Sequence, residues 1–276
     1  MRLTFATPLD GAGLLAFFAL RAVPGIEEVR DGTYRRSLGL PHGAGVVALT
    51  PRAAHVEATI AVDDPRDHDA AIARCRVLLD LDADPAAIDE RLARDRVLAP
   101  LVQATPGVRV PGAADAAELA VRALLGQQIS VAAARTHAAR LVLAHGEPLR
   151  APAGTVTHVF PTAAALVDAE LAAPESRRRA LRTLAAALAS GDVRLERPGD
   201  EAALLALPGI GPWTASYVAM RALRDSDAFM PTDLGVRHGL ERLGRDGGPK
   251  AATALAERWR PYRAYATMHL WGALRP

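Results

Sequence analysis

A five-residue turn, residues 208–212 (PGIGP), constrains the fold more than any other segment of the chain. Glycine accepts positive φ angles and has no side chain, so Gly209 and Gly211 are expected to turn sharply and to let a neighbour approach the main chain. Apolar helical patterns on either side predict a helix-hairpin-helix unit over about residues 200–224. Free N–H groups at the start of its second helix, near Trp213, can bind a phosphate; an ordinary helix connection is the alternative.

The first 65 residues show the alternation that is typical of strands. Residues 55–62 place Val56, Ala58, Ile60 and Val62 on one face, which predicts a half-buried strand. Residues 45–50 precede it across a short connection and predict an antiparallel hairpin. Further strands are expected at residues 3–7 and 33–38, and helices at 14–22 and 66–79. The natural arrangement is an antiparallel sheet covered by helices on one face.

From about residue 85 onward the patterns are helical. Asp115, with Glu118 three residues later, predicts a capped helix start, and Ser130, Thr162 and Asp200 are expected to cap later helices. Residues 147–158 are expected to form a loop. Further helices are expected at 177–190, 213–223, 234–243, 251–259 and 262–274. The fold class is therefore α+β, mostly α: an N-terminal domain of residues 1–85 packed on an all-helical body of residues 86–276.

Composition limits the cellular setting. Half of the 276 residues are hydrophobic, which is enough for a sizeable core, and the single cysteine, Cys75, excludes a disulfide within the chain and a four-cysteine iron–sulfur cluster. The apolar run at residues 14–20 is too short to span a membrane and is expected to be a buried helix. We expect a monomer in the reducing cytoplasm, associated with the nucleoid in a prokaryote, and no membrane partner.

The charge is unevenly distributed. Residues 1–100 carry 12 basic and 15 acidic side chains, whereas the remainder carries 21 and 16. The part with the glycine-containing turn is thus net positive, which favours a phosphate-bearing partner over an unspecific solvated surface.

Asp233 is the candidate for chemistry. It follows Pro231 and Thr232 and precedes a helical pattern, so a simple N-cap is the competing interpretation. The intervening helix is expected to return it to the hairpin. An ionised carboxylate beside a sugar C1′ can stabilise an oxocarbenium-like transition state or orient a water.

Aromatic residues gather in the same part of the chain. Seven of the 12 lie between Trp213 and Trp271, including all three tryptophans. Trp213 and Tyr217 are four residues apart and share a helix face, so they are expected to sandwich an extruded base; packing in a helical core is the alternative. Two of the three tryptophans are expected in a pocket.

These motifs resemble the helix-hairpin-helix DNA glycosylases, and within them the 3-methyladenine DNA glycosylase II (AlkA) type. The resemblance covers nearly the whole chain, through residues 17–23, 121–127, 160–162, 207–221, 229–233 and 257–271. It departs from the family pattern at Gln128, where relatives can carry an apolar wedge, and at Leu234 and Gly272, where aromatic residues are often found. These departures suggest a more open pocket.

The resemblance implies a role for each candidate residue. Asp233 would be the catalytic carboxylate, and Gln128 would wedge into the DNA gap left by a flipped base. The base pocket would be formed by Trp213, Tyr217, Trp271, Phe17 and Gln127, and phosphate would be bound by Gly209, Gly211 and Thr214. Main-chain carbonyls of Leu205, Leu207 and Gly209 would hold a structural monovalent cation, and no other cofactor is expected.

The expected function is that of a monofunctional hydrolase in base-excision repair. It would bind duplex DNA through the minor groove, flip an alkylated purine such as N3-methyladenine or N7-methylguanine, and leave an abasic site. Strand-cutting relatives carry a lysine where this chain has Trp213, and the only lysine is Lys250. Relatives that remove mismatched adenine generally carry the excluded cysteine cluster. A non-catalytic DNA-binding protein is the main alternative; a histidine-based metal hydrolase is disfavoured by the histidine spacing.

Overall fold

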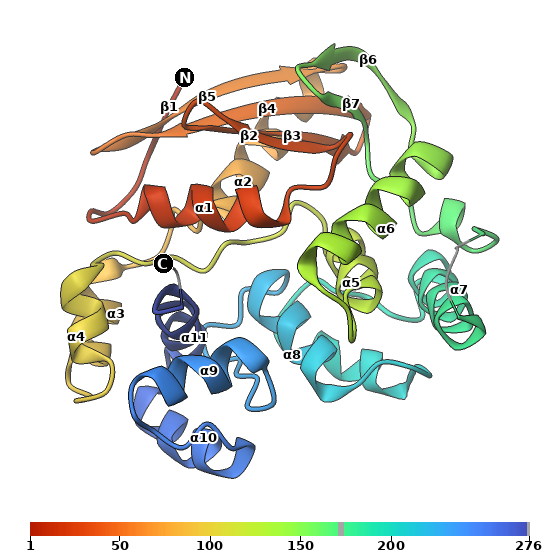
Figure 1. Ribbon diagram of the computed structural model, residues 1–276. Helices are drawn as coiled ribbons and strands as arrows, with labels where there is room; N and C mark the ends of the chain where they lie inside the picture. Colours follow the sequence, from red (N-terminus) through yellow and green to blue (C-terminus); the bar gives the residue numbers. More distant parts are fainter. Residues whose placement is uncertain (171–173, 275–276) are drawn as a thin grey trace.

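A computed structural model describes residues 1–170 and 174–274, in which a five-stranded antiparallel sheet covers a layer of helices (Figure 1). The strand order is β1-β5-β4-β3-β2. The strands are β1 (Arg2–Thr4), β2 (Glu27–Arg30), β3 (Thr33–Leu40), β4 (Gly43–Pro51) and β5 (His55–Val62). The predicted hairpin is confirmed, because β4 pairs with β5 along its length. β2 was not predicted.

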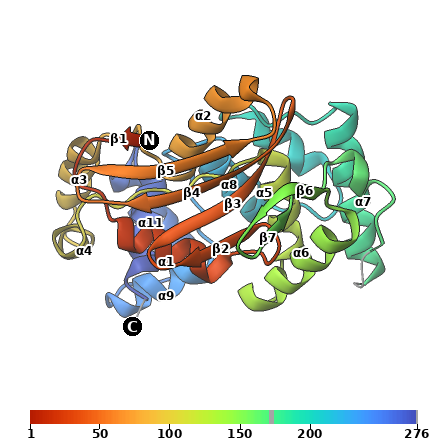
Figure 2. The ribbon, with the colours of Figure 1, turned by 90° about the horizontal axis from the view of Figure 1, so that it is seen from above.

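Helices α1 (Gly11–Arg21) and α2 (His68–Leu78) cover the face of the sheet that points toward the body (Figures 1 and 2). Alternation explains the burial, since Val56 and Ala58 of β5 and Val47 and Leu49 of β4 are buried. The expectation that residues 14–20 are buried holds only in part. Leu14 and Phe17 point inward, but Leu20 is 55% exposed, because α1 is amphipathic and presents one side to solvent.

The body is mostly helical, as predicted. Its elements are α3 (Pro85–Ala93), α4 (Ala99–Ala104), α5 (Ala116–Leu125), α6 (Val131–His145), α7 (Glu175–Ser190), α8 (Pro212–Arg221), α9 (Leu234–Arg242), α10 (Pro249–Ala256) and α11 (Arg263–Gly272). Short 3₁₀ helices lie at η1 (Pro65–Asp67), η2 (Ala164–Leu166), η3 (Asp200–Ala206) and η4 (Glu257–Trp259). Within the described residues no helix combines the length and apolarity needed to cross a membrane.

The predicted helix caps are partly confirmed. Asp115 accepts from the Glu118 N–H, and Ser130 accepts from the Ala133 N–H. Glu118 does not complete a capping box, because its carboxylate binds arginines instead. Asp200 was expected to cap the first hairpin helix, but it accepts from the N–H groups of Glu196 and Arg197 on the preceding loop. That first helix, η3, is a 3₁₀ helix.

The body is not wholly helical, and the expected loop at residues 147–158 is wrong. It contains an antiparallel hairpin of β6 (Pro148–Ala153) and β7 (Val156–His158). Figure 2 shows this hairpin beside β3 and β4, and Val156 also bridges to Gly25. Proline and glycine in this stretch hide the strand pattern in the sequence. The hairpin is stabilised by contacts with segments that are distant in the sequence, which no local pattern shows.

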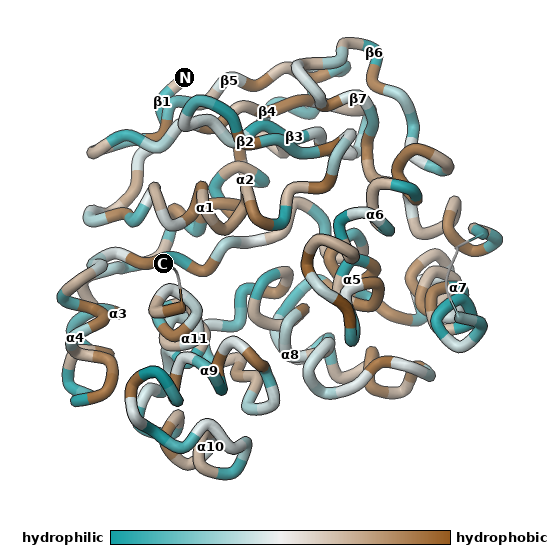
Figure 3. Tube along the Cα trace, viewed as in Figure 1, coloured by the Kyte–Doolittle hydropathy of each residue, from teal (hydrophilic) through white to brown (hydrophobic). Residues whose placement is uncertain are grey.

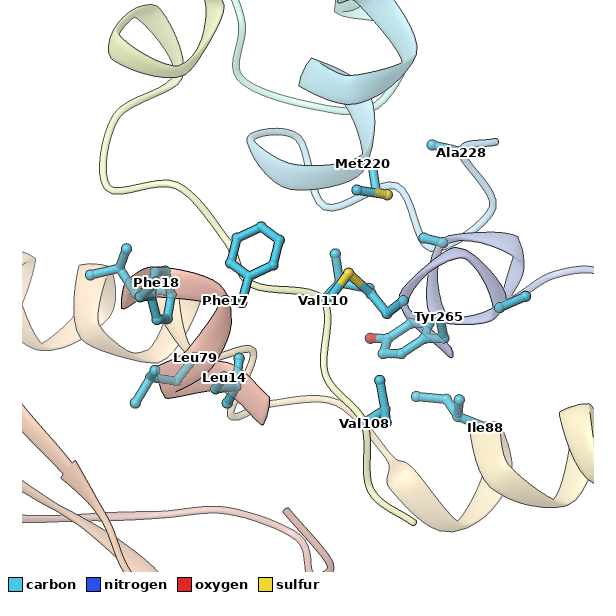
Figure 4. Close-up of a cluster of buried hydrophobic side chains, with 14 of the residues drawn as sticks. Leu14, Phe17, Phe18, Leu79, Ile88, Val108, Val110, Met220, Ala228 and Tyr265 are labelled. Carbon is cyan, nitrogen blue, oxygen red and sulfur yellow. The ribbon is translucent and has the colours of Figure 1, made fainter. Parts of the chain in front are cut away.

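One hydrophobic core joins the sheet to the C-terminal helices. It includes Phe18 and Leu14 of α1, Val108 and Val110 of the connecting segment, and Tyr265 of α11 (Figure 4). A second core packs α5, α6, α7 and α8 together. Figure 3 shows the hydrophobic residues of α1 and α5 in the interior between the sheet and the lower helices. Cys75 is a free, buried residue of the first core, as expected.

A cluster of buried charges lies where the sheet meets α5. Arg36 of β3 donates to Glu118 at 2.7 Å and to Glu27 at 3.2 Å, and Arg122 lies 2.7 Å from Glu118 and 3.0 Å from Glu27. The Tyr34 hydroxyl donates to Glu27 at 2.7 Å. Burial alone would raise the pKa of Glu27, but Arg122, Arg36 and Tyr34 outweigh it and hold the pKa at about 2. This arginine–glutamate cluster joins the sheet to the body.

Candidate active site

An open cleft of about 1390 Å³ lies where the helical body meets the end of α1. Its walls come from the end of α1, the turn between α5 and α6, the hairpin with α8, the start of α9, and α11. The predicted site residues in its lining are Gln127, Gln128, Gly209, Gly211, Trp213, Thr214, Tyr217, Asp233 and Trp271. The cleft therefore gathers predicted site residues that are up to 144 positions apart in the sequence, from Gln127 to Trp271.

Asp233 is the only acidic residue in the lining of this cleft. It is the N-cap of α9, with its Oδ1 accepting from the Val236 N–H at 2.9 Å. The same Oδ1 accepts from Trp271 Nε1 at 2.8 Å, and Oδ2 accepts from Trp213 Nε1 at 2.9 Å. Asp233 is thus both the N-cap of α9 and a neighbour of the hairpin helix, so the two interpretations of this residue hold together. Three N–H donors fix the orientation of a carboxylate that is 9% exposed.

Two glycines that the sequence analysis did not single out allow this arrangement. A Cβ added at Gly235 would lie 2.5 Å from Trp271 Cδ1 and 3.0 Å from Asp233 Oδ1. A Cβ at Gly239 would lie 2.7 Å from the Leu270 carbonyl oxygen. Because the two glycines are four residues apart, they lie on one face of α9 and let it approach α11 closely. That spacing is the signal that could have identified them.

The aromatic residues form the cleft walls differently from the expected sandwich. Trp213 and Tyr217 stack directly on each other, with ring centroids 5.2 Å apart and an angle of 8° between planes. There is no room for a base between them, so the expected sandwich of these two rings is not formed. Trp213 and Trp271 line the cleft, whereas Trp259 is fully buried against Phe229. Two of the three tryptophans therefore lie in the pocket, as predicted.

Arg221 holds the inner end of Tyr217. Its guanidinium donates to the carbonyls of Pro111 and Gly112, and to the Tyr217 hydroxyl at 2.8 Å. Burial opposes ionisation of Tyr217, but Arg221 and Arg21 outweigh burial and lower the pKa of the phenol. Neither arginine was predicted as a site residue, because Arg221 stands in the sequence only as a polar residue in the apolar pattern of α8, and Arg21 as the last residue of α1.

Phe17 lies behind the cleft surface. It stacks near Trp271, with centroids 6.3 Å apart and planes at 15°, but it is 6% exposed and is not part of the cleft lining. The guanidinium carbon of Arg21 lies 3.9 Å from the centre of the Phe17 ring and thereby covers it. Phe17 therefore lies behind the cleft wall and does not line it as predicted, because Arg21 covers its ring.

The hairpin turn uses its two glycines differently. Gly209 has φ +84°, and a Cβ there would lie 2.8 Å from the Ala180 Cβ of α7, so glycine is required. Gly211 has φ −102° and is the N-cap of α8, so it does not adopt the positive φ that was expected. A Cβ at Gly211 would meet no atom within 4 Å, which leaves its main chain open to a ligand.

Gln127 connects the α5–α6 turn to the hairpin. Its Nε2 donates to the Gly209 carbonyl at 3.0 Å and to Thr214 Oγ1 at 2.8 Å. The Gln127 amide group therefore holds the hairpin turn in place, and the residue also lines the cleft, as predicted. Thr214 is 2% exposed and its hydroxyl accepts from Gln127, so its role as a phosphate binder stays a prediction.

Gln128 is the exposed tip of the same turn. It adopts φ +59°, which is uncommon for a residue with a side chain. Arg177 of α7 donates to the Gln127 carbonyl at 2.7 Å and fixes the turn from below. The tip thus lies in the lining of the cleft, and its role as a wedge stays a prediction.

The hairpin carbonyls match the chemistry of a hard cation. The carbonyls of Leu207 and Gly209 each accept one hydrogen bond, from the Ile210 N–H and from Gln127 Nε2, and each keeps a second lone pair. Among the described residues, no group of three or more His, Cys, Asp and Glu side chains is placed to hold a metal ion. A main-chain oxygen site is therefore the kind of metal site that these residues fit.

Comparison with known proteins finds similarity over nearly the whole chain. Residues 1–115 match the family model described as the AlkA N-terminal domain. DNA-3-methyladenine glycosylase 2 of Escherichia coli is 36% identical over 279 residues, which cover 98% of this chain and 95% of that protein. A 3-methyladenine DNA-glycosylase from Archaeoglobus fulgidus shares the fold, with a TM-score of 0.84, 23% identity, and 98% and 97% of the two chains covered.

A longer relative is also similar. The Mycobacterium tuberculosis protein named a probable bifunctional transcriptional activator/DNA repair enzyme AlkA is 48% identical over 281 residues. The match covers 99% of this chain but 57% of that relative, so the chain spans little more than half of its length.

Proposed function

The chain belongs to the DNA-3-methyladenine glycosylase 2 (AlkA) family, and from this premise we propose that it is a monofunctional DNA glycosylase that removes alkylated purines. The observation that carries the proposal is the Asp233 carboxylate, held by two indole N–H groups at the edge of an aromatic cleft. The proposed partner is duplex DNA, acted on by a cytoplasmic monomer, and the proposed product is an abasic site.

Asp233 supplies the chemistry in this proposal. Its two oxygens accept from Trp213, Trp271 and the Val236 N–H, and none of these donors is a cation. Its negative charge is therefore available to a positive charge that develops on the sugar. The carboxylate stabilises the oxocarbenium-like transition state and receives a proton from the water that attacks C1′.

The indole walls favour an electron-poor base. A flipped purine that enters beside Trp213 and Trp271 gains stacking, and a positively charged alkylated purine gains a cation–π attraction of about 0.5–2 kcal/mol. Because such a base already carries positive charge, it leaves without further protonation, which suits a site with a single carboxylate. N3-methyladenine and N7-methylguanine are the substrates that we propose.

The hairpin and the α5–α6 turn hold the DNA. Gly211 and the free N–H groups at the start of α8 bind one phosphate, a contact that positions the duplex without reading its sequence. Gln128, held at φ +59°, fills the space vacated by the flipped base from the minor groove and bends the duplex. A monovalent cation on the carbonyls of Leu205, Leu207 and Gly209 would stiffen the hairpin.

Strand cleavage is not part of the proposal. A Schiff base needs an amine in the cleft, and Trp213 occupies the position where strand-cutting relatives carry lysine. Lys250, the only lysine of the chain, is exposed on α10 and is not part of the cleft lining.

The test is the single-turnover release of N7-methylguanine from a duplex oligonucleotide by the wild type and by Asp233→Asn. We expect the variant to release the base about a thousandfold more slowly, with unchanged duplex affinity in fluorescence anisotropy. Asp246→Asn, at an exposed loop aspartate, is the matched control and should behave as wild type. Binding without release by the wild type would instead support a non-catalytic DNA clamp.

A further inference from the structure

Arg21 places a positive charge on the aromatic wall of the cleft. Its guanidinium carbon lies 3.9 Å from the centre of the Phe17 ring and 5.6 Å from that of Trp271. Both distances are within the range of about 6 Å at which a cation is attracted by a ring face. Arg21 lines the cleft, whereas Phe17 behind it does not. The guanidinium therefore occupies the surface that a base would contact.

The two arginines of this wall are held differently. Arg221 is 6% exposed and is anchored by the Pro111 and Gly112 carbonyls and by the Tyr217 hydroxyl. Arg21 has no carboxylate within 4.0 Å among residues 1–170 and 174–274. Its main-chain carbonyl accepts a hydrogen bond from Arg122 at 2.9 Å. Burial lowers the pKa of Arg21 and Arg221 lowers it further, whereas Tyr217 and Asp233 raise it.

Arg21 is thus a partly desolvated cation without a carboxylate partner among the described residues, and Arg122 holds its main-chain carbonyl. A base that enters the cleft would meet this guanidinium on the wall, so that its charge lies beside the base. We propose that Arg21 determines how this cleft discriminates between cationic and neutral bases. The proposal rests on the proposed function and adds to it a specificity-determining residue.

The reason is the charge of the leaving group. When a neutral base leaves, the C1′–N bond breaks with its electron pair on the base, which becomes an anion. Water forms the new bond to C1′, its proton passes to Asp233 and then to solvent, and the base takes up a proton from solvent. A guanidinium beside the base stabilises that anion. A cationic base leaves neutral, so Arg21 gives it no such help and repels it on entry.

The test compares two duplexes that differ only in the base, N7-methylguanine as the cationic and hypoxanthine as the neutral one. Arg21→Met keeps the length and removes the charge, and it should slow release of the neutral base about 10- to 100-fold without slowing release of the cationic base. Arg21→Lys keeps the charge and should retain most of the neutral-base activity. Arg135→Met removes another positive charge from the cleft lining, at an arginine that donates to the Ala22 carbonyl and not to a ring face, and it should leave the ratio of the two rates unchanged.

A second measurement does not depend on excision. Quenching of tryptophan fluorescence reports binding of the planar cation 1-methylnicotinamide and of neutral nicotinamide, because Trp213 and Trp271 line the cleft. Arg21→Met should increase the preference for the cation about tenfold. If the wild type releases neither base, the proposed glycosylase activity fails, and the probe ratio alone decides on Arg21. An unchanged probe ratio, or equal slowing of both bases, overturns the inference.

Discussion

Glu118 and Asp233 are both largely buried carboxylates of the helical body, but their neighbours differ. Glu118 binds two arginines, Arg36 and Arg122, each at 2.7 Å, inside the arginine–glutamate cluster. Asp233 binds two indoles and a main-chain N–H, and it lines the open cleft. Each carboxylate has its hydrogen-bond partners, but of the two only Glu118 has arginines within 4.0 Å among the described residues.

This difference indicates what each carboxylate does. A buried charge needs a counter-charge or strong hydrogen-bond donors. The two arginines on Glu118 balance its negative charge, so it does not serve to attract a ligand. Neutral donors orient Asp233 and leave its carboxylate without a direct ion pair in the lining of the cleft. We therefore expect Glu118 to serve stability and Asp233 to serve chemistry.

The largest effect on stability should follow from Glu118→Gln. The change leaves Arg36 and Arg122 with less negative charge than they need, so the free energy of unfolding should fall by about 3 to 5 kcal/mol. Urea denaturation measures this. The matched control is Glu90→Gln, which breaks an exposed ion pair with Arg94 and should cost less than about 0.5 kcal/mol. Equal effects of the two variants would remove the distinction between the paired and the open carboxylate.

Gly235→Ala tests the role of the Asp233 carboxylate through one of its two indole donors. The added methyl group would meet Trp271 Cδ1 at 2.5 Å and Nε1 at 2.6 Å, and it would push the indole away from Asp233. Single-turnover base release should fall about 100-fold, comparable to the loss of one donor to a reacting charge. Gly239→Ala is the comparison, because its methyl group would meet the main chain of Leu270 and not the Trp271 ring, so it should lower stability with a smaller loss of release per folded molecule. Unchanged release by Gly235→Ala would contradict a role for the Trp271 hydrogen bond.

Protonation of Glu27 in acid should remove the contribution of the arginine–glutamate cluster to stability. The pKa of Glu27 is about 2 in the folded chain against 4.5 for the ordinary group, so its contribution to stability is complete above pH 4.5 and is lost as the pH falls toward 2. The stability gap between the wild type and Glu27→Gln should therefore narrow in this window. Chemical denaturation at several pH values from 6 to 2 tests this, and a constant gap would contradict it.

The smallest expected effect concerns the hairpin. Gly211→Ala meets open space at φ −102°, so stability should hardly change, while loss of one close phosphate contact should weaken duplex binding about fivefold. Gly209→Ala has the opposite expectation. At φ +84° and 2.8 Å from Ala180, the alanine should lower the free energy of unfolding by about 1–2 kcal/mol.

Local patterns predicted much of this fold. The strand at 55–62 has the predicted bounds, because its alternation depends only on which side chains face the helices. The N-caps at Asp115, Ser130 and Asp233 could be identified because the capping hydrogen bond joins residues three positions apart. The β6–β7 hairpin could not, since its pattern is interrupted by proline and its partners lie on the distant sheet.

The candidate site was predictable in its residues but not in its contacts. The motif spacing indicated Asp233 and Trp213, the family resemblance implied Trp271, and the fold brings all three together. The partners of the Gln127 amide are 82 and 87 residues away, and the guanidinium of Arg21 reaches Trp271 across the cleft. Such contacts depend on how helices that are distant in the sequence pack against one another, and no local sequence pattern determines that packing.

The most direct test of the central claim measures both properties in both variants. Base release per folded molecule and the free energy of unfolding are determined for Asp233→Asn and for Glu118→Gln. The account predicts a crossed result: Asp233→Asn loses release and keeps most of its stability, whereas Glu118→Gln loses stability and keeps release. If Glu118→Gln abolished release while folded, or if Asp233→Asn released the base at the wild-type rate, the assignment of stability to the paired carboxylate and chemistry to the open one would be contradicted.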